Sequence, residues 1–141
     1  LTIGLQNLII LQTMSRFDKL FASSSANNQN WKQLKSESQL IELLEESKQK
    51  PVAIFKHSTR CGISHMVKDK VESQYDFKKQ DLSFYFLDLL NYRPISNAVA
   101  QKLNVPHQSP QLILLKGGNV VHNASHHMID LNNIKTHLRA L

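Results

Sequence analysis

Short apolar segments alternate with amphipathic ones along most of this chain, and this alternation limits the fold more than any other feature. Three apolar segments predict buried strands: Val52–Phe55, Leu82–Leu87 and Gln111–Leu115. The Lys-Gly-Gly-Asn sequence at 116–119 predicts a hairpin turn, and Val120–Asn123 is then the returning strand. Since helical segments separate the first strands, we expect those strands to pair in parallel, whereas the hairpin adds an antiparallel pair.

Four amphipathic segments predict helices around these strands. They are a helix capped by Ser36 or Ser38 that runs through Lys50, a helix after Cys61, one from about Ile95 to Leu103, and one over Asp130–Ala140. In the second helix, Met66 and Val71 are expected to face inward, and Pro94 suits the first turn of the third. The resulting order of helices and strands along the chain, α-β-α-β-α-β-β-α, is that of the thioredoxin fold. We therefore expect an α/β protein with a central four-stranded mixed sheet flanked by helices.

The length of 141 residues suits one domain, and we assign residues 31–141 to it. Ser23–Asn30 is small and polar and predicts a linker. Residues 1–30 are expected to be an extension that is poorly ordered or non-native. We expect either that translation naturally starts at Met14 or that Leu1 reflects an alternative start codon. The apolar segment Leu1–Leu11 is too short to span a membrane, so no membrane partner is expected.

The formal net charge is +6, but the basic residues are spread along the chain and mixed with glutamates in the predicted helices. A nucleic-acid-binding protein is expected to show a basic cluster with interleaved aromatic residues, so we predict no nucleic-acid partner. The chain has one cysteine, which excludes an intramolecular disulfide and gives no support to an oxidising compartment. The expected location is the cytoplasm.

That cysteine, Cys61, follows the first predicted strand where the next helix begins. The free N–H groups of a first helical turn and the helix dipole favour a thiolate by about 0.3–1 kcal/mol. Lys56, His57 and Arg60 are expected to add positive charge, and the thiolate is the nucleophile in disulfide exchange. A lone cysteine is more often an inert buried residue. Its neighbours, however, are polar or small and suit a core poorly: Ser58, Thr59, Arg60, Gly62 and Ser64.

A proline directly precedes the third predicted strand. Pro110 cannot donate to a strand ladder, so it belongs at the first position of the strand or at an edge. A cis Ser109–Pro110 bond would turn the Ser109 backbone toward the thiol. The N–H and C=O of Ser109 could then pair with an incoming disulfide-bonded chain.

Four sequence blocks in this order resemble the YtxJ-like monothiol bacilliredoxins of the thioredoxin superfamily. The blocks are Lys56–Ser64, Asp88-Leu89 with Arg93–Ser96, His107–Gln111, and Ala124–His126. The resemblance covers about Trp31–Leu141 and implies a thioredoxin-like fold in bacteria that use the small thiol bacillithiol. It implies that Cys61 is the nucleophile and Pro110 a cis-proline. The other residues that it places at the site are Arg60, Gly62, Ile63, Ser64, His107 and Ser109.

The implied reaction is removal of bacillithiol from protein mixed disulfides. The Cys61 thiolate attacks the mixed disulfide, and bacillithiol passes to Cys61. The expected partners are bacillithiolated client proteins, with bacillithiol as co-substrate and no bound cofactor. Because Ser64 stands where dithiol relatives carry a second cysteine, an external low-molecular-weight thiol must resolve the intermediate. The chain departs from the family at Gly62, often proline, which loosens the helix start, and at His127, often aromatic.

Two alternatives remain open. The Cys-Gly-Ile-Ser sequence at 61–64 also resembles the Cys-Gly-Phe-Ser motif of monothiol glutaredoxins, which hold an iron–sulfur cluster with one protein thiolate and glutathione. The other alternative is a non-catalytic interaction module with a thioredoxin fold. A metal site at His122, His126 and His127 is not expected. Metal sites need three or four converging ligands, and strand alternation would send His126 and His127 to opposite sides.

Overall fold

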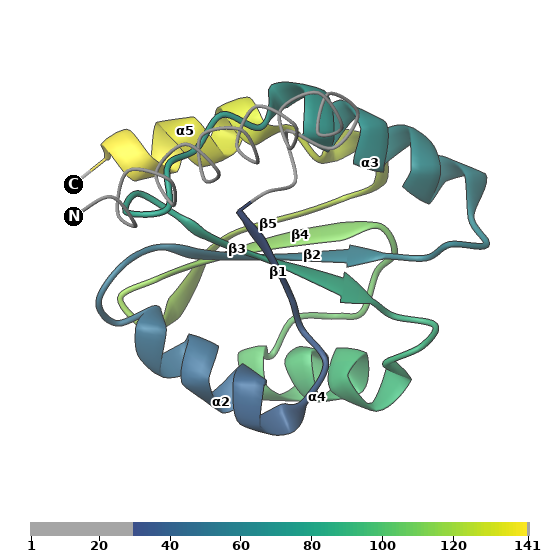
Figure 1. Cartoon of the computed structure of the whole chain (residues 1–141), viewed down its shortest axis with the longest axis horizontal. Coiled ribbons are helices and arrows are strands. Elements are labelled where there is room, and N and C mark those ends of the chain that lie inside the picture. The colour runs from purple at the N-terminus through teal and green to yellow at the C-terminus, as the bar shows by residue number, and fades with distance from the viewer. Residues whose placement is uncertain (1–29, 141) are drawn as a thin grey trace, which may run out of the picture.

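Strands β2 (Val52–His57) and β3 (Ser83–Asp88) lie side by side and parallel at the centre of a five-stranded sheet. Strand β1 (Trp31–Gln33) pairs parallel to β3 on one side. On the other side, β4 (Gln111–Lys116) pairs antiparallel to β2, and β5 (Asn119–Ser125) pairs antiparallel to β4. The order across the sheet is therefore β1-β3-β2-β4-β5 (Figure 1). The predicted mixed α/β arrangement is confirmed.

The structure is a computed structural model that describes residues 30–140. The predictions for an extension, a linker and a start at Met14 lie outside these residues, apart from Asn30. None of the helices within residues 30–140 is long and apolar enough to cross a membrane.

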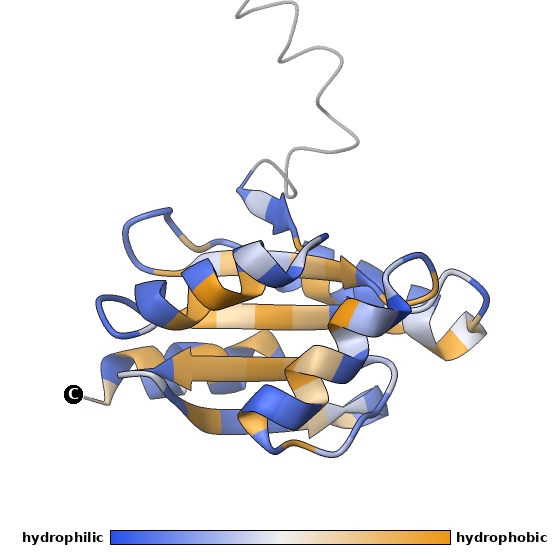
Figure 2. Cartoon of the chain, turned by 90° about the horizontal axis from the view of Figure 1, so that it is seen from below, coloured by the Kyte–Doolittle hydropathy of each residue, from blue (hydrophilic) through white to orange (hydrophobic). Residues whose placement is uncertain are grey.

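Helices cover both faces of the sheet (Figure 1). Their bounds are α2 (Glu37–Glu46), α3 (Gly62–Gln74), α4 (Arg93–Leu103) and α5 (Leu131–Arg139), with a short 3₁₀ helix η3 (His126–Met128) before α5. One apolar cluster joins α3 and α5 to the sheet, and a second joins α2 and α4 to its other face. Figure 2 looks onto the sheet from one side and shows apolar strands together with helices that mix hydrophilic and apolar residues.

Local sequence signals fix the ends of several elements. The Ser36 side chain accepts a hydrogen bond from the backbone N–H of Gln39 at 3.2 Å and caps α2. Asp130 caps α5 in the same manner, and Pro94 lies in the first turn of α4, as predicted. The β4–β5 turn uses glycine at 117 and 118, with φ of 61° and 80°. Glycine adopts this left-handed region without steric cost.

The side chains of β2 alternate between the two faces of the sheet, and this alternation later decides the chemistry of the site. Val52 and Ile54 pack with α2 and α4, whereas Ala53 and Phe55 pack with α3 and α5. Because β2 continues to His57, Lys56 and His57 also lie on opposite faces. Both side chains are buried at the carboxyl end of the strand, where the loop to Cys61 begins.

Two predictions about the fold are wrong. The sheet has five strands instead of four, because β1 adds three residues next to β3. Met66 does not face inward; its side chain is 66% exposed. Since α3 begins at Gly62, its buried positions are Ser64, Val67 and Val71, which follow helical spacing.

Candidate active site around Cys61

Cys61 is the N-cap residue of α3, directly before Gly62, the first residue of the helix. It has extended backbone angles, φ −107° and ψ 122°, and its carbonyl accepts the hydrogen bond from the His65 N–H at 3.2 Å. Its own N–H donates to the carbonyl of Ser58 at 3.3 Å, which closes the turn between β2 and the helix. The side chain is partly exposed. The thiol therefore lies at the amino end of a helix, next to N–H groups that have no partner within the helix.

Hydrogen bonds from the first turn of α3 lower the pKa of the Cys61 thiol. The backbone N–H of Ser64 contributes most, and the Ser64 hydroxyl and the Ile63 N–H add to it. Partial loss of hydration acts in the opposite direction. These donors stabilise the thiolate more than the thiol, and the thiolate is the reactive form in disulfide exchange. The predicted effect of the helix amino end is present.

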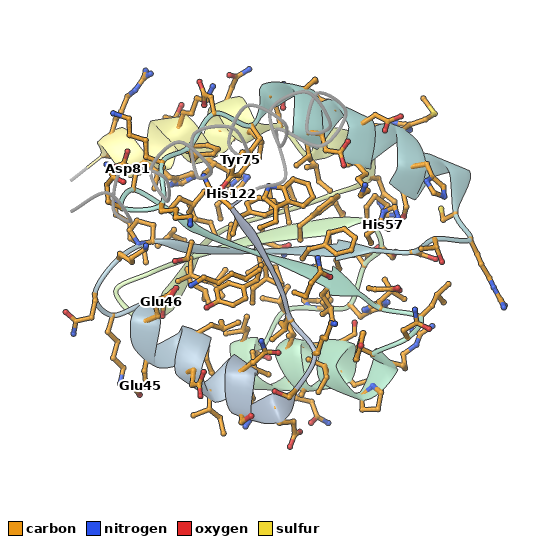
Figure 3. All side chains as sticks on the ribbon, viewed as in Figure 1. Glu45, Glu46, His57, Tyr75, Asp81 and His122 are labelled. Carbon is orange, nitrogen blue, oxygen red and sulfur yellow. The ribbon has the colours of Figure 1, made fainter. Side chains whose placement is uncertain are left out.

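The cationic neighbours predicted to help the thiolate do not contribute to this shift. His57 lies on the α3 side of the sheet, with its ring 5.2 Å from that of His65 (Figure 3). Burial, followed by the nearby His65 and Lys68, lowers the pKa of His57, so its imidazole is mainly neutral at pH 7. Arg60 is exposed in the loop. Positive charge from these side chains is therefore not what holds the thiolate.

Lys56 points to the opposite face, toward α4, and is fully buried. Its Nζ lies 3.1 Å from the Ser96 carbonyl oxygen and 3.3 Å from Nδ1 of His107. Burial, together with the charge of Arg93, lowers the pKa of Lys56 from 10.5 to about 8. Sequence reasoning missed this arrangement. The period of two along β2 could have shown the face on which Lys56 lies, had the predicted strand been extended by two residues, but not the contact with His107.

The loop before β4 carries the second part of the site. The Ser109–Pro110 peptide bond is cis, as the resemblance implied. Lys56 is the register partner of Gln111, which places Ser109 and Pro110 beside the carboxyl end of β2. Cys61 follows that same end, so the fold brings the two predicted parts of the site to one edge of the sheet. The Ser109 Oγ is buried and has no hydrogen-bond partner within residues 30–140.

Gln111 holds this loop in place, a role that sequence reasoning did not assign. Its buried side chain donates from Nε2 to the Pro106 carbonyl and to Oδ1 of Asn123, both at 3.0 Å. Its Oε1 accepts from the Gln108 N–H at 3.3 Å. His107, between these contacts, is exposed. The loop is thereby fixed while its predicted site-lining histidine stays accessible.

The remaining predicted site residues form the first turn of α3. Ser64 is fully buried, and its Oγ accepts from the Ser58 N–H at 3.4 Å. A side chain at Gly62 would enter open space, so packing does not require glycine there. Ile63 is 40% exposed, and with the exposed Met66, three residues further along α3, it forms an apolar rim on the first turns of the helix that follows Cys61.

The other polar residues singled out in the sequence lie outside this site. Asp88 accepts a hydrogen bond from the side chain of Asn91 at 2.7 Å. His122 faces His137, with ring centroids 4.9 Å apart, and its two predicted companions belong to η3. In the part of the chain that the structure describes, no three His, Cys, Asp or Glu side chains converge to hold a metal ion.

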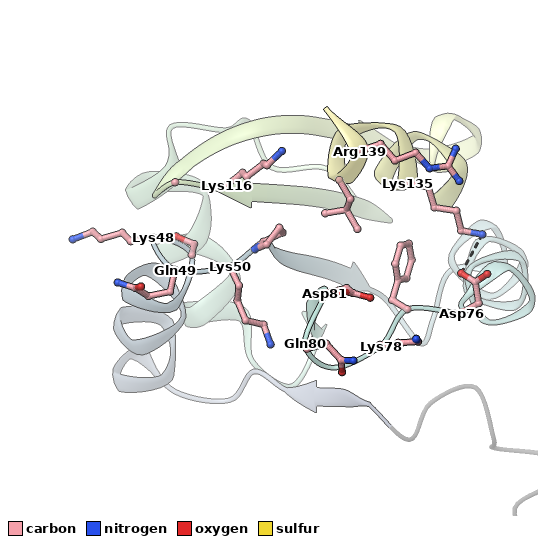
Figure 4. Close-up of a pocket in the computed structure, with 15 residues that line it drawn as sticks. Lys48, Gln49, Lys50, Asp76, Lys78, Gln80, Asp81, Lys116, Lys135 and Arg139 are labelled. Atoms are coloured by element: carbon pink, nitrogen blue, oxygen red, sulfur yellow. Dashed lines mark ion pairs between the residues drawn. The ribbon is translucent and has the colours of Figure 1, made fainter. Parts of the chain in front are cut away.

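A pocket of about 690 Å³ lies at the opposite end of the sheet from the thiol (Figure 4). Its walls come from the residues before β2, the loop before β3, the β4–β5 turn and α5. Basic side chains are frequent there, but several are already engaged. Lys135 pairs with Asp76 at 3.1 Å, and Lys116 donates to the carbonyl oxygens of His137 and Ala140. No residue of the Cys61 site lines this pocket.

A cysteine at the amino end of the helix after a central strand, next to a cis-proline loop, defines a thiol–disulfide exchange protein of the thioredoxin fold. A solved structure described as having a thioredoxin fold is 30% identical, with a TM-score of 0.66, and covers 78% of this chain and 95% of that chain. The family of the monothiol bacilliredoxin BrxC matches residues 32–134. The chain therefore belongs to the monothiol bacilliredoxins.

More distant solved structures show the same fold. Thioredoxin O2 from Arabidopsis thaliana is 24% identical, with a TM-score of 0.59, and the match covers 79% of this chain and 94% of that chain. Mitochondrial thioredoxin 3 from Saccharomyces cerevisiae is 17% identical, with a TM-score of 0.59, over 82% of this chain and 99% of that chain. The predicted thioredoxin-like fold is confirmed.

Ser64→Ala is expected to raise the pKa of Cys61, because it removes the hydroxyl donor and keeps the backbone N–H. The rate of alkylation by iodoacetamide, followed from pH 5 to pH 10, measures this pKa. The variant should reach half of its maximal rate at a higher pH than the wild type. Ser73→Ala, on the last turn of α3 and exposed, is the matched control. Coincident curves for Ser64→Ala and the wild type would contradict the role of the hydroxyl.

Proposed function

We propose that this protein removes bacillithiol from mixed disulfides with protein cysteines, in the cytoplasm of bacteria that use this thiol. Membership of the monothiol bacilliredoxin family supports this reaction. The observation that carries it is a single, partly exposed cysteine whose thiolate is stabilised by Ser64, a residue that cannot itself form a disulfide. Such a site can accept a small thiol and cannot release it alone.

In the first step, the Cys61 thiolate attacks the bacillithiol sulfur of the mixed disulfide. The bond between that sulfur and the client sulfur breaks, and the client leaves as a thiolate that takes a proton from water. A disulfide between Cys61 and bacillithiol forms. The donors at Ser64 and Ile63 hold the attacking sulfur in its charged form.

In the second step, the thiolate of an external low-molecular-weight thiol attacks the bacillithiol sulfur on Cys61. The Cys61 sulfur leaves as a thiolate, and bacillithiol departs as a disulfide with the external thiol. The proton released by the external thiol balances the proton taken up by the client. We propose that bacillithiol serves as co-substrate and that no bound cofactor takes part. The Ser109 backbone and the apolar rim of Ile63 and Met66 are suited to contact the client chain.

The test is transfer of bacillithiol from a peptide to the reduced full chain. The reduced protein is mixed with a peptide whose cysteine carries bacillithiol, and both products are weighed by mass spectrometry. We expect the protein to gain one bacillithiol on Cys61 and the peptide to lose one. Cys61→Ser should do neither. A wild-type protein that gains no adduct would overturn the proposal.

The two alternative functions, cluster carriage and a non-catalytic interaction module, predict other experimental results than the exchange reaction does. Carriage of an iron–sulfur cluster predicts a brown dimer when the protein is isolated without oxygen, whereas the exchange reaction predicts a colourless protein that accepts bacillithiol. A non-catalytic interaction module predicts that Cys61→Ser keeps all binding and cellular effects of the wild type.

A further inference from the structure

A buried ammonium group without a carboxylate lies beside the loop that carries Pro110. Lys56 has no exposed surface, and no carboxylate within residues 30–140 forms an ion pair with it. Its contacts are the Ser96 carbonyl and Nδ1 of His107. A buried charge is costly unless it is paired. With its pKa of about 8, Lys56 still carries that charge in most molecules at pH 7.

The contact with Lys56 determines which nitrogen of His107 carries the proton. An ammonium group only donates, so Nδ1 of His107 is the acceptor, and in the neutral ring the proton is then on Nε2. Burial, followed by the charges of Lys56 and Arg93, lowers the pKa of His107, which keeps the ring neutral at pH 7. His107 is exposed, so its Nε2–H is available as a donor to a bound molecule.

Arg93 adds a full charge at the same place. It is the first residue of α4, it is exposed, and it acts electrostatically on both Lys56 and His107. The first turn of α4 contains no acidic residue, and Arg93 forms no ion pair with any residue that the structure describes. Residues from three segments thus meet at this place. Lys56 of β2 and Arg93 of α4 supply positive charge, and His107 of the loop before β4 supplies a free N–H donor.

This cluster adjoins the site of disulfide exchange. His107 is two residues from Ser109, so their Cα atoms lie within about 7 Å of each other. Lys56 belongs to the strand that leads directly to Cys61, and it is the register partner of the residue after Pro110. A small thiol bonded to Cys61 that extends along this loop therefore approaches Arg93 and His107.

We propose that Arg93, His107 and Lys56 form a carboxylate-binding subsite that favours small thiols carrying carboxylate groups. Arg93 and the Nε2–H of His107 contact the carboxylate. Lys56 is a positioning residue that acts from the protein interior, because it fixes the proton on Nε2 of His107 and adds positive charge. The inference rests on the proposed exchange at Cys61, and it names the part of the small thiol that the site recognises.

The test compares two mixed disulfides of one peptide. One carries bacillithiol, whose malate group has two carboxylates, and the other carries its malate dimethyl ester, which has none. The rate of peptide release by excess reduced protein is divided by the rate with dithiothreitol, which removes differences in intrinsic reactivity. We expect the corrected wild-type rate to be about fivefold higher with the free carboxylates, and this preference to weaken in 1 M salt.

Variants locate the source of the preference. Arg93→Gln and Lys56→Met should each bring the ratio of the two corrected rates close to one. Lys102→Gln, an exposed cation in the last turn of the same helix, should keep the wild-type ratio. Equal corrected rates for the two probes in the wild type would overturn the subsite and leave the exchange reaction intact. If the wild type reacts with neither probe, the proposed exchange itself fails.

A spectroscopic measurement separates positioning by Lys56 from general packing. In the wild type, ¹⁵N chemical shifts should show His107 neutral at pH 7 with its proton on Nε2. Lys56→Met removes the ammonium donor to Nδ1 and leaves the Ser96 hydroxyl 3.4 Å from that nitrogen. Because a hydroxyl can either donate to Nδ1 or accept from it, a mixture of the two tautomers is expected. An unchanged tautomer in Lys56→Met would contradict the role assigned to Lys56.

Discussion

Ser64→Cys is expected to let the chain release bacillithiol from Cys61 without an external thiol. The Ser64 side chain already hydrogen-bonds the Cys61 sulfur, so a thiol at that position is within reach of a disulfide. The introduced thiolate attacks the Cys61 sulfur, bacillithiol leaves as a thiolate, and an intramolecular disulfide remains. The measurement is a mass-spectrometric time course on adduct-loaded protein freed of small thiols. The variant should lose the mass of bacillithiol, whereas the wild type keeps it.

Ser64→Ala is the matched control, because it changes the same buried position and adds no thiol. Its adduct should persist like that of the wild type. If Ser64→Cys retained bacillithiol as long as the wild type does, the monothiol character of the site would not follow from residue 64.

Lys56→Met is expected to increase the free energy of unfolding at pH 7. The folded-state pKa of about 8 lies below the ordinary value of 10.5, so burial of the charged form penalises the folded state. At 1.36 kcal/mol per pKa unit, the penalty is about 3 kcal/mol. It applies in full below pH 8 and is relieved as the pH rises from 8 toward 10.5, because the folded protein loses its proton first. Urea denaturation at pH 7 and pH 10 measures it.

The difference between Lys56→Met and the wild type should therefore be large at pH 7 and small at pH 10. Lys102→Met, which changes an exposed lysine, should stay within about 0.5 kcal/mol of the wild type at both pH values. A gap of the same size at pH 7 and pH 10 would show that packing, and not charge, is responsible. The expected result would mean that Lys56, a member of the proposed subsite, lowers the free energy of unfolding of the protein at pH 7.

The fold was predictable where apolar periodicity was strong. The strands at 52–57, 83–88 and 111–116 are buried over nearly their whole length, and the glycines of the β4–β5 turn mark the hairpin. Strand β1 escaped prediction because only Trp31 among its three residues is apolar, and its pairing with β3 is a long-range contact. Met66 was misplaced because the inward face of α3 depends on the residue at which the helix begins.

The site was predictable in its positions and less so in its electrostatics. A strand followed by a helix fixes where Cys61 lies, and a proline before β4 marks the facing loop. The contribution of cationic neighbours was wrong, because closeness in sequence does not determine the face of a strand on which a side chain lies. Lys56 and His57 are adjacent in the chain and separated by the sheet. The link from Lys56 to His107 joins residues 51 positions apart and has no local signal.

The hydrogen bonds from the first turn of α3 to Cys61 also affect the direction of the proposed exchange. Since the folded helix stabilises the thiolate, the thiolate stabilises the folded helix by the same free energy. A sulfur that holds a small thiol in a disulfide carries no charge and loses this contribution. Above the pKa of Cys61, this contribution favours the empty, reduced protein over the loaded one, and it therefore acts toward release of the small thiol. In the proposed exchange, this favours a transient relay of small thiols over their storage.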